Sequence, residues 1–282
     1  MKPTVAVIAA GAMGSGVAGR LTQNAIAVTT SLAGRSPASA ARAQAAGMRP
    51  VSDAEIADAD IILSIVPPGE ALALAARLAP HLAAAARKPL YVDCNAVNPQ
   101  TVARIAAVIE ATGARFVDGG IIGGPPAPGT TGTSIYVSGP HAPELAVLIN
   151  HGLEIRVLPS AIGAASALKM SYAGITKGFT ALGAAMMLAA TRGGAADDLR
   201  AELAASQPAL FGWLSRQLPR MYSKAYRWVA EMEEIAGFNE DDPAARQIFL
   251  GAAGLYQRLA EDFADGKKEI GALDDFLKPR KQ

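Results

Sequence analysis

The 282-residue chain has few of the residues that build disulfides, metal sites or nucleic-acid surfaces. It contains one cysteine, Cys94, which cannot form an internal disulfide, and three histidines that lie far apart in the sequence. Because no cluster of such ligands exists in the sequence, we expect no metal site. The net charge is only +1 and no basic stripe is present, so we do not expect a nucleic acid as a partner.

Long hydrophobic runs are also missing. The most apolar stretch, residues 178–190, covers about 13 residues between Lys177 and Arg192, whereas a transmembrane helix needs roughly 20. An apolar strand pattern begins within a few residues of the first methionine, which leaves no room for a signal peptide. We therefore predict a cytoplasmic protein with no membrane partner.

What the chain does have is a glycine-rich turn directly after its first apolar run, in the sequence VAVIAAGAMGSG of residues 5–16. This order predicts the strand, turn and helix of a dinucleotide-binding βαβ unit. Gly11 would let the backbone approach a pyrophosphate, and Gly14 would let the helix pack closely on the sheet. The usual first glycine is Ala9, so only AxGxxG remains. Alone, this motif fits an ordinary glycine-rich turn equally well.

Up to about residue 160, short apolar runs alternate with alanine-rich helical patterns, which is typical of a parallel α/β sheet. Strands are expected at residues 4–9, 27–31, 61–66, 90–94, 115–118, 134–138 and 154–157. Helices are expected between them at residues 13–24, 37–46, 70–87, 99–111 and 142–151. Ser36 before Pro37 and Asn98 before Pro99 predict helix N-caps with proline at the first helical position.

After residue 161 the strand patterns stop. Helical patterns cover residues 164–191, 195–204, 208–217, 219–235 and 243–265. We therefore predict an α/β fold in which an N-terminal Rossmann-type parallel-sheet domain, residues 1–161, is followed by an all-helical C-terminal domain, residues 162–282. A long helix joins the two. The first domain would bind the dinucleotide and the second would serve the substrate and dimerisation.

The end of the second strand indicates which dinucleotide is bound. NAD sites usually have an acidic residue there that bonds the ribose 2′-hydroxyl, but residues 29–36 read TTSLAGRS and the next acid is Asp53. Arg35 could stack on adenine and pair with a 2′-phosphate, and Ser36 could donate a hydrogen bond to it. This segment favours NADP (NADPH) over NAD. The alternative is a solvated loop arginine.

Two further strand ends carry candidate residues. The strand at 61–66 ends in Val66 and Pro67, and the strand at 90–94 runs into Asn95. Open α/β sheets bind ligands at the carboxyl ends of their strands, so we expect these three residues to contact the cofactor. Asn95 could bond a ribose or substrate hydroxyl, or it could simply shape the turn before the next helix.

The long helix carries a polar stripe that lies within about 60° of one line. Its members are Ser166, Lys169, Tyr172, Thr176 and Thr180. A lysine that faces a cleft could have its pKa lowered by burial and act as a proton donor. The alternative is an ordinary lysine that reaches from an alanine-rich helix to solvent. Lys177 lies off the stripe and is interpreted as structural or solvent-facing.

Together these motifs resemble the β-hydroxyacid dehydrogenase family, which includes 6-phosphogluconate dehydrogenase, 3-hydroxyisobutyrate dehydrogenase and tartronate semialdehyde reductase. Residues 8–14, IAAGAMG, are similar to the family's IGLGxMG opening. Residues 92–99, VDCNAVNP, are similar to its VDxSTxSP segment, and residues 118–125, DGGIIGGP, to its DAPVSGGP substrate loop. Residues 163–169 resemble the start of the helix that carries its catalytic lysine.

The resemblance implies roles for individual residues. Lys169 would donate a proton to the carbonyl oxygen in reduction and remove it in oxidation, while a hydride passes between the substrate carbon and nicotinamide. Ala12 and Met13 would belong to the cofactor turn. The substrate would be a small molecule that contacts the loop residues Ile122, Gly123 and Gly124. The resemblance also implies a homodimer.

Besides Ala9 and Asn95, which replace a glycine and a serine of the family motifs, the chain departs from the family pattern at three places that concern the substrate and the cofactor. Ile122 replaces a serine, Tyr172 replaces an asparagine, and residues 231–236, EMEEIA, lack the usual basic residue. These changes indicate a divergent branch. Our leading hypothesis is an NADP-dependent oxidoreductase that acts on a small hydroxy acid or alcohol, with Tyr172 orienting the substrate oxygen or sharing its proton. The alternatives are imine-reductase-like C=N reduction and a catalytically inactive NADPH-binding protein.

Overall fold

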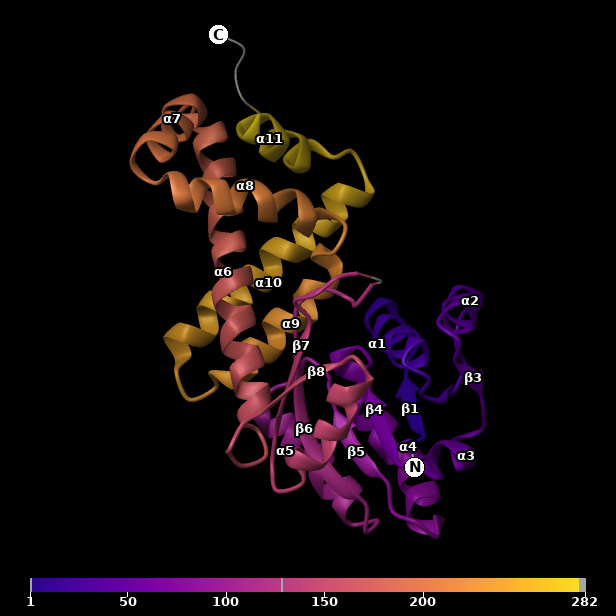
Figure 1. Cartoon of the computed structure of the whole chain (residues 1–282). Helices are drawn as coiled ribbons and strands as arrows, with labels where there is room; N and C mark the ends of the chain where they lie inside the picture. Colours follow the sequence, from indigo (N-terminus) through magenta and orange to yellow (C-terminus); the bar gives the residue numbers. More distant parts are fainter. Residues whose placement is uncertain (1, 128, 279–282) are drawn as a thin grey trace. The chain divides into compact units, whose positions relative to one another are not determined.

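A computed structural model describes residues 2–127 and 129–278, and it divides the chain into two compact units, Met1–Met170 and Ser171–Gln282 (Figure 1). The division falls between Met170 and Ser171, inside helix α6 (Ala164–Arg192), whereas the sequence predicted a boundary before this helix, between residues 161 and 162. It lies there because the first residues of α6 are hydrogen-bonded to the sheet of the first unit.

The first unit contains an eight-stranded sheet in the order β3-β2-β1-β4-β5-β6-β7-β8. The strands are β1 (Val5–Ile8), β2 (Val28–Thr30), β3 (Arg49–Pro50), β4 (Ile61–Ser64), β5 (Leu90–Asp93), β6 (Arg115–Ile122), β7 (Ser134–Ser138) and β8 (Glu154–Val157). Strands β1 to β6 pair in parallel, as predicted, but β7 runs antiparallel to β6 and β8 is parallel to β7. The sequence missed β3, because an exposed Arg-Pro pair carries no apolar pattern.

Helices cover both faces of this sheet, because its strands are apolar on both sides. One face packs against α1 (Ala12–Gln23), α2 (Pro37–Ala45) and the 3₁₀ segment η2 (Ala142–His151). The other packs against α3 (Asp53–Ala57), α4 (Ala71–Ala84) and α5 (Pro99–Glu110). Figure 1 shows α1 and α2 beside β1 at the N-terminal end of the colour scale. The Rossmann-type prediction is confirmed.

Both predicted N-caps are present. The Ser36 side chain accepts a hydrogen bond from the Ser39 backbone N–H at 3.3 Å, and Asn98 Oδ1 accepts one from the Thr101 N–H at 2.8 Å. In each case proline opens the helix, because its missing N–H needs no partner in the first turn.

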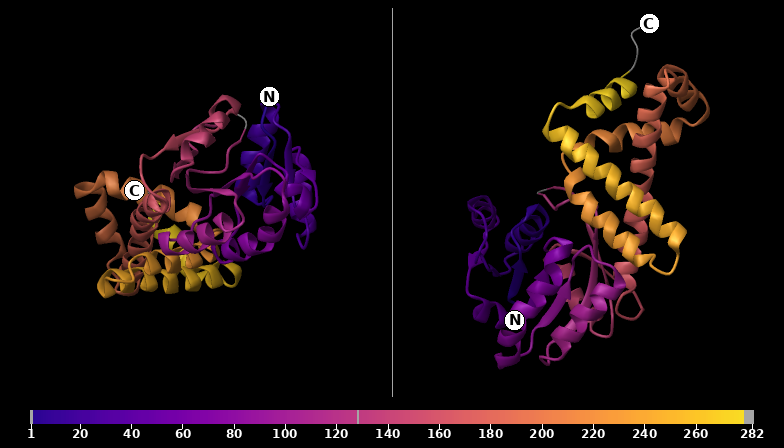
Figure 2. Two further views of the ribbon diagram at one scale, coloured as in Figure 1. Left: turned by 90° about the horizontal axis from the view of Figure 1, so that it is seen from below. Right: turned by 180° about the vertical axis from the view of Figure 1, so that it is seen from behind.

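The second unit is helical, as predicted. It contains the rest of α6 with α7 (Ala196–Ser206), α8 (Pro208–Tyr222), α9 (Ala225–Phe238), α10 (Pro243–Ala264) and α11 (Lys268–Leu277). Helices α9 and α10 lie side by side (Figure 2). The predicted helix start at Pro219 is wrong, because α8 runs through this proline, and α11 was not predicted.

Among the described residues, α6 alone is long and apolar enough to cross a membrane, with a mean hydropathy of 1.3 over its most apolar window. However, 39% of that window is buried inside the protein. A core helix has the same composition, so this one helix carries no membrane assignment.

Candidate functional site

The predicted site residues gather at one edge of the sheet. Strands β2, β1, β4, β5 and β6 are parallel neighbours, so the segments that follow them leave the sheet on the same side. This edge receives the turn at residues 11–14, Arg35 and Ser36, Val66 and Pro67, Asn95, and residues 122–124.

The turn after β1 fits the pyrophosphate of a dinucleotide. Gly11 is the N-cap of α1, no described side chain caps this helix, and its first turn holds no acidic residue. The N–H groups at the start of α1, which belong to Ala12 and Met13, are therefore free of side-chain partners and carry the positive end of the helix dipole. In the described part of the chain, no atom lies within 4 Å of a Cβ placed at Gly11, so these residues leave the space beside it open.

Gly14 is required by the packing of α1 on the sheet. A Cβ at this position would lie 1.9 Å from the carbonyl oxygen of Ala9, closer than any side chain tolerates. Gly16 has a related role, since its Cβ would lie 2.7 Å from the Pro126 carbonyl oxygen. The close approach of helix and strand therefore explains the second glycine of AxGxxG, even though Ala9 replaces the first.

Two arginines belong to the segment after β2. Arg35 Nη1 forms an ion pair with Glu70 Oε2 at 3.0 Å, and Glu70 is the last residue of the 3₁₀ segment η1 (Pro68–Glu70). Arg42 donates from Nε to the Ala10 carbonyl at 2.9 Å and from Nη2 to Ser39 Oγ at 3.0 Å. Arg42 therefore ties the turn after β1 to α2. The sequence did not reveal this role, because Ala10 and Arg42 are far apart along the chain.

Asn95 is buried and joins the ends of β4 and β5. Its Oδ1 accepts a hydrogen bond from the Val66 N–H at 2.6 Å, and its Nδ2 donates to Ser64 Oγ at 2.9 Å and to Asp93 Oδ1. These bonds correspond to the turn-shaping role that the sequence left open. A contact between Asn95 and cofactor or substrate stays a prediction.

Asp93 is a buried carboxyl with an unusual pKa. Burial raises its pKa to about 7, and the nearby Asp118 adds to the rise, while the hydrogen bond from the Asn95 backbone opposes it. Its Oδ2 has no hydrogen-bond partner among the described residues. Burial also raises the pKa of the neighbouring Cys94 thiol, which disfavours its nucleophilic thiolate form.

Asp118, which the sequence analysis did not single out, holds the start of α6. Its Oδ2 accepts hydrogen bonds from Ser138 Oγ at 2.8 Å and from the backbone N–H groups of Gly163, Ala165 and Ser166 at 2.9, 3.0 and 3.1 Å. Its Oδ1 accepts from Ser166 Oγ at 2.6 Å. A carboxylate at a helix N-terminus is favoured by the helix dipole, so this buried charge is well compensated.

Lys169 lies directly against β6. A Cβ on Gly120 would lie 3.0 Å from Lys169 Cβ and 2.8 Å from the Ala165 carbonyl oxygen, so only glycine lets this turn of α6 approach the strand. The lysine side chain is half-buried. The structure therefore brings Lys169 to the strand that ends in the predicted substrate loop.

The polar stripe on α6 is not one continuous exposed surface. Ser166 and Thr180 are buried, whereas Tyr172, one turn after Lys169, is 49% exposed. Thr176 and Thr180 donate their hydroxyls to backbone carbonyls one turn earlier in the helix, each at 2.9 Å. The acid/base role of Lys169 and the substrate-orienting role of Tyr172 stay predictions.

The two glycines in the loop after β6 differ in the space around them. Gly123 has a φ of +119°, and a Cβ there would lie 2.2 Å from the Gly132 carbonyl oxygen. No atom of the described residues lies within 4 Å of the Cβ position of Gly124, and its carbonyl accepts a hydrogen bond from Thr133 Oγ1 at 2.5 Å. Ile122 pairs with Ser134 in the sheet. Gly124 is thus the loop position that leaves space for a ligand.

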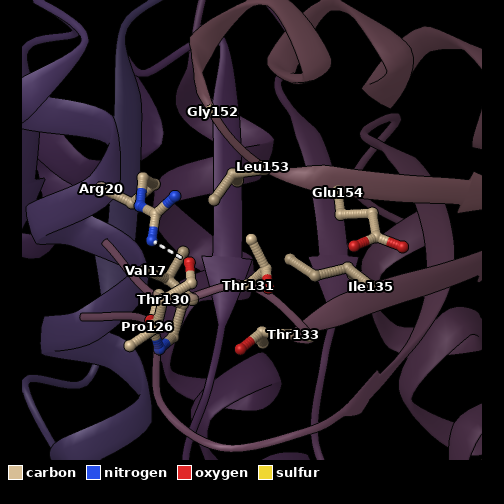
Figure 3. Close-up of a pocket in the computed structure, with 11 residues that line it drawn as sticks. Val17, Arg20, Pro126, Thr130, Thr131, Thr133, Ile135, Gly152, Leu153 and Glu154 are labelled. Atoms are coloured by element: carbon tan, nitrogen blue, oxygen red, sulfur yellow. Dashed lines mark hydrogen bonds between the residues drawn. The ribbon is translucent and has the colours of Figure 1, made fainter. Parts of the chain in front are cut away.

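A cavity of about 100 Å³ lies between α1, the loop before β7 and the start of β8 (Figure 3). Arg20 lines it and donates from Nη2 to the carbonyls of Ala127 and Thr130, at 2.8 and 2.9 Å. The cavity is lined by none of the predicted site residues. It is also well below the roughly 300 Å³ of a typical ligand pocket. We therefore assign it to the packing of this loop on α1.

Lys177 has a structural role in the helical unit. It forms an ion pair with Glu231, and the two side chains are only 15% and 17% exposed. Its Nζ lies 4.9 Å from the centre of the Trp228 ring, and its carbonyl accepts a hydrogen bond from the Tyr256 hydroxyl at 2.6 Å. Residues 231–236, EMEEIA, contain no basic residue, but Glu231 at their start pairs with Lys177 of α6.

The sequence matches two described families. Residues 4–146 match the NAD binding domain of 6-phosphogluconate dehydrogenase, and residues 190–259 match a domain of unknown function, DUF1932. A curated relative, the "Uncharacterized 28.5 kDa protein in 7S RNA 5'region" of Methanothermus fervidus, is 31% identical over 176 residues. The match covers 62% of this chain and 66% of that protein, so the chain spans just under two thirds of the relative's length.

Solved structures share the fold. The conserved protein MTH1747, described as of unknown function and structurally similar to 3-hydroxyacid dehydrogenases, is 29% identical with a TM-score of 0.69 over 92% of this chain and 97% of its own. The 3-hydroxyisobutyrate dehydrogenase of Mycobacterium tuberculosis is 20% identical, with a TM-score of 0.69 over 97% and 99% of the chains. An imine reductase of Myxococcus stipitatus, in complex with NADP+, is 20% identical with a TM-score of 0.56 over 98% and 100%.

Proposed function

Because the chain belongs to the 6-phosphogluconate dehydrogenase-like β-hydroxyacid dehydrogenases, we propose that it is an NADP-dependent oxidoreductase acting on a small hydroxy acid or alcohol and its carbonyl form. The observation that carries this proposal is the position of Lys169. Gly120 lets the lysine pack against β6, and Asp118 anchors the start of its helix. This strand leads to the edge of the sheet where the dinucleotide turn also lies.

The first unit offers a binding residue for each part of the dinucleotide. The N–H groups of residues 12–14 at the start of α1 would hold the pyrophosphate, and Gly11 would let it approach. Arg35 and Ser36 would bind the 2′-phosphate, and Val66, Pro67 and Asn95 would line the adjoining strand ends. When bound, the dinucleotide supplies or accepts the hydride at its nicotinamide ring.

Lys169 would be the general acid and base of the reaction. In reduction its ammonium group donates a proton to the substrate oxygen, and in oxidation the neutral amine takes that proton back. The side chain is half-buried beside β6, the strand that leads to the proposed substrate site. Tyr172, one turn further along α6, would orient the substrate oxygen or share its proton.

Ile122, the last residue of β6, and the loop that follows it would set the substrate class. Ile122 offers no hydroxyl for a carboxylate, so polar recognition would fall to the backbone of Gly123 and Gly124 and to Lys169. A small substrate with one apolar side fits this composition. The single buried thiol agrees with a cytoplasmic enzyme, which is the location we propose.

The test is a spectrophotometric assay of NADPH oxidation against a panel of small keto acids, aldehydes and ketones. Lys169→Met should lower kcat by two to four orders of magnitude on any accepted substrate, as loss of a general acid does. NADPH affinity should stay within about twofold, because Lys169 does not belong to the dinucleotide turn. Near-normal turnover by Lys169→Met would remove the lysine from the mechanism.

Imine reduction is the second candidate, favoured by Tyr172 and by the apolar Ile122 at the end of β6. The discriminating feature is the lysine, because a C=N substrate carries its own basic nitrogen and a neutral or acidic side chain suits it better. Cyclic imines should therefore be included in the same NADPH assay. Turnover of imines but not of carbonyls would replace our proposal, and tight NADPH binding without any turnover would indicate a binding protein.

We further propose a homodimer formed through α6. Five large side chains form an exposed apolar stripe on this helix: Tyr172, Ile175, Phe179, Leu182 and Met186. Their spacing alternates between three and four residues, as in helices that pack side by side. The stripe carries no charge, so a second copy of it would meet no like-charge repulsion.

A further inference from the structure

The ion pair between Arg35 and Glu70 joins the segments that leave the sheet on either side of the glycine-rich turn. Arg35 follows β2, Glu70 follows β4, and β1 with its glycine-rich turn lies between these two strands. The Arg35 side chain is 22% exposed and the Glu70 side chain 49%, so ligands reach both groups. The fold does not need the pair to cap α2, because Ser36 does so.

We infer that Glu70 sets the choice between NADP and NAD by competing with the ribose 2′-phosphate for Arg35. This inference rests on the dinucleotide binding proposed above. A 2′-phosphate carries about two negative charges, and its recognition by arginine is bidentate, so it needs the guanidinium that Glu70 now holds. Binding of a 2′-phosphate therefore breaks the Arg35–Glu70 pair and leaves a carboxylate beside the incoming charge.

The same carboxylate suits a ribose without that phosphate. NAD-binding sheets place an acidic residue at the 2′-hydroxyl, usually from the end of the second strand. Here residues 29–36 contain no acid, and Glu70 brings one to Arg35 from the segment after β4 instead. Arg35 thus favours a ribose 2′-phosphomonoester and Glu70 opposes it, so the two side chains together set the selectivity.

The test compares wild type with Glu70→Gln in direct binding titrations. NADPH and NADH are followed by their fluorescence, and 2′,5′-ADP and 5′-ADP by calorimetry. Glu70→Gln should tighten NADPH and 2′,5′-ADP about fivefold, a change of about 1 kcal/mol, and should not tighten NADH or 5′-ADP. The gain should shrink at high salt, because both groups are exposed.

Glu269→Gln is the matched control. Glu269 pairs with Arg258 at 2.9 Å in the helical unit, so this variant also removes one carboxylate from an Arg–Glu pair and has the same net charge. It should change none of the four affinities. Equal effects of Glu70→Gln on NADPH and NADH, or no effect on either, would overturn the inference.

A second variant separates this inference from the proposed function. Arg35→Met should weaken NADPH and 2′,5′-ADP and leave NADH nearly unchanged. If Arg35→Met has this effect and Glu70→Gln has none, only the role of Glu70 falls. If wild type binds neither NADPH nor NADH, the proposed function and the inference fall together.

Discussion

Asp93 and Asp118 face each other in register on β5 and β6, yet their surroundings differ completely. Asp118 accepts hydrogen bonds from the Ser166 hydroxyl and the N–H groups at the start of α6, whereas one buried oxygen of Asp93 has no partner among the described residues. Hydrogen bonds stabilise a carboxylate, and burial without them stabilises the neutral acid. Burial therefore raises the pKa of Asp93, whereas both oxygens of Asp118 are held by hydrogen bonds from the start of α6.

This difference predicts opposite effects of asparagine at the two positions. The folded-state pKa of Asp93, about 7, lies above its ordinary value of 3.8, so between roughly pH 4 and 7 the folded protein keeps a proton that the unfolded chain has lost. The free energy of unfolding therefore falls as the pH rises through this window. Asp93→Asn should raise it at pH 8, by at most roughly 4 kcal/mol, and leave it nearly unchanged at pH 4.

Asp118→Asn is the contrasting variant. An asparagine side chain has one acceptor oxygen and no charge, so it cannot replace both oxygens of Asp118, which accept hydrogen bonds from the N–H groups and the Ser166 hydroxyl at the start of α6. This variant should lower the free energy of unfolding at pH 8 by about 2 kcal/mol or more. Chemical denaturation of both variants at the two pH values measures these effects. An Asp93→Asn effect that does not depend on pH would contradict the assignment.

At the scale of the elements, the contact between α6 and β6 determines where Lys169 lies. It depends on Gly120, which the sequence analysis saw only as part of a family loop. Gly120→Ala should push the first turns of α6 away from the strand, because its Cβ would overlap the Ala165 carbonyl and Lys169 Cβ. We expect kcat to fall about tenfold or more, with a stability loss of about 1–3 kcal/mol.

Steady-state kinetics and thermal denaturation measure these two effects. Gly251→Ala on α10 is the control, because a Cβ there meets no atom within 4 Å and alanine is a good helix former. It should leave kcat unchanged and stability equal or slightly higher. Full activity of Gly120→Ala would show that the fit of α6 on β6 does not position the lysine.

The sequence predicted these elements well where patterns were local. Apolar runs predicted every strand except β3, and the caps at Ser36 and Asn98 predicted two helix starts. It failed where the cause lies far along the chain. Asp118 bonds Gly163 across 45 residues, and no local pattern marks that partnership. The sequence also predicts a helix start at Pro219, but α8 continues through this proline.

At the scale of the whole molecule, the exposed stripe on α6 makes a prediction about assembly. Ile175 and Leu182 are 63% and 59% exposed, and burying them against a second chain would remove apolar area from water. Size-exclusion chromatography with light scattering should give twice the chain mass for wild type. Ile175→Glu and Leu182→Glu should shift this mass towards the monomer, because each would bury a charge in the interface.

Ile248→Glu provides the control for this experiment. Ile248 is 65% exposed on α10, outside the stripe, so the variant adds the same charge to an equally exposed position. It should keep the wild-type mass. A monomeric wild-type protein, or an unchanged mass for Ile175→Glu, would rule out the stripe as the interface.

The single cysteine, Cys94, directly follows β5, and the rate at which a thiol reagent labels it would measure how often this part of the sheet opens. Cys94 is buried beside Gly119, whose missing side chain leaves just enough room for the sulfur. A thiol reagent reaches this sulfur only when that part of the sheet opens, so the labelling rate reports the free energy of opening without any engineered probe. Any ligand that binds the folded sheet slows the labelling, and the concentration needed gives its affinity. The protein can therefore be screened for its dinucleotide and substrate before any reaction is known.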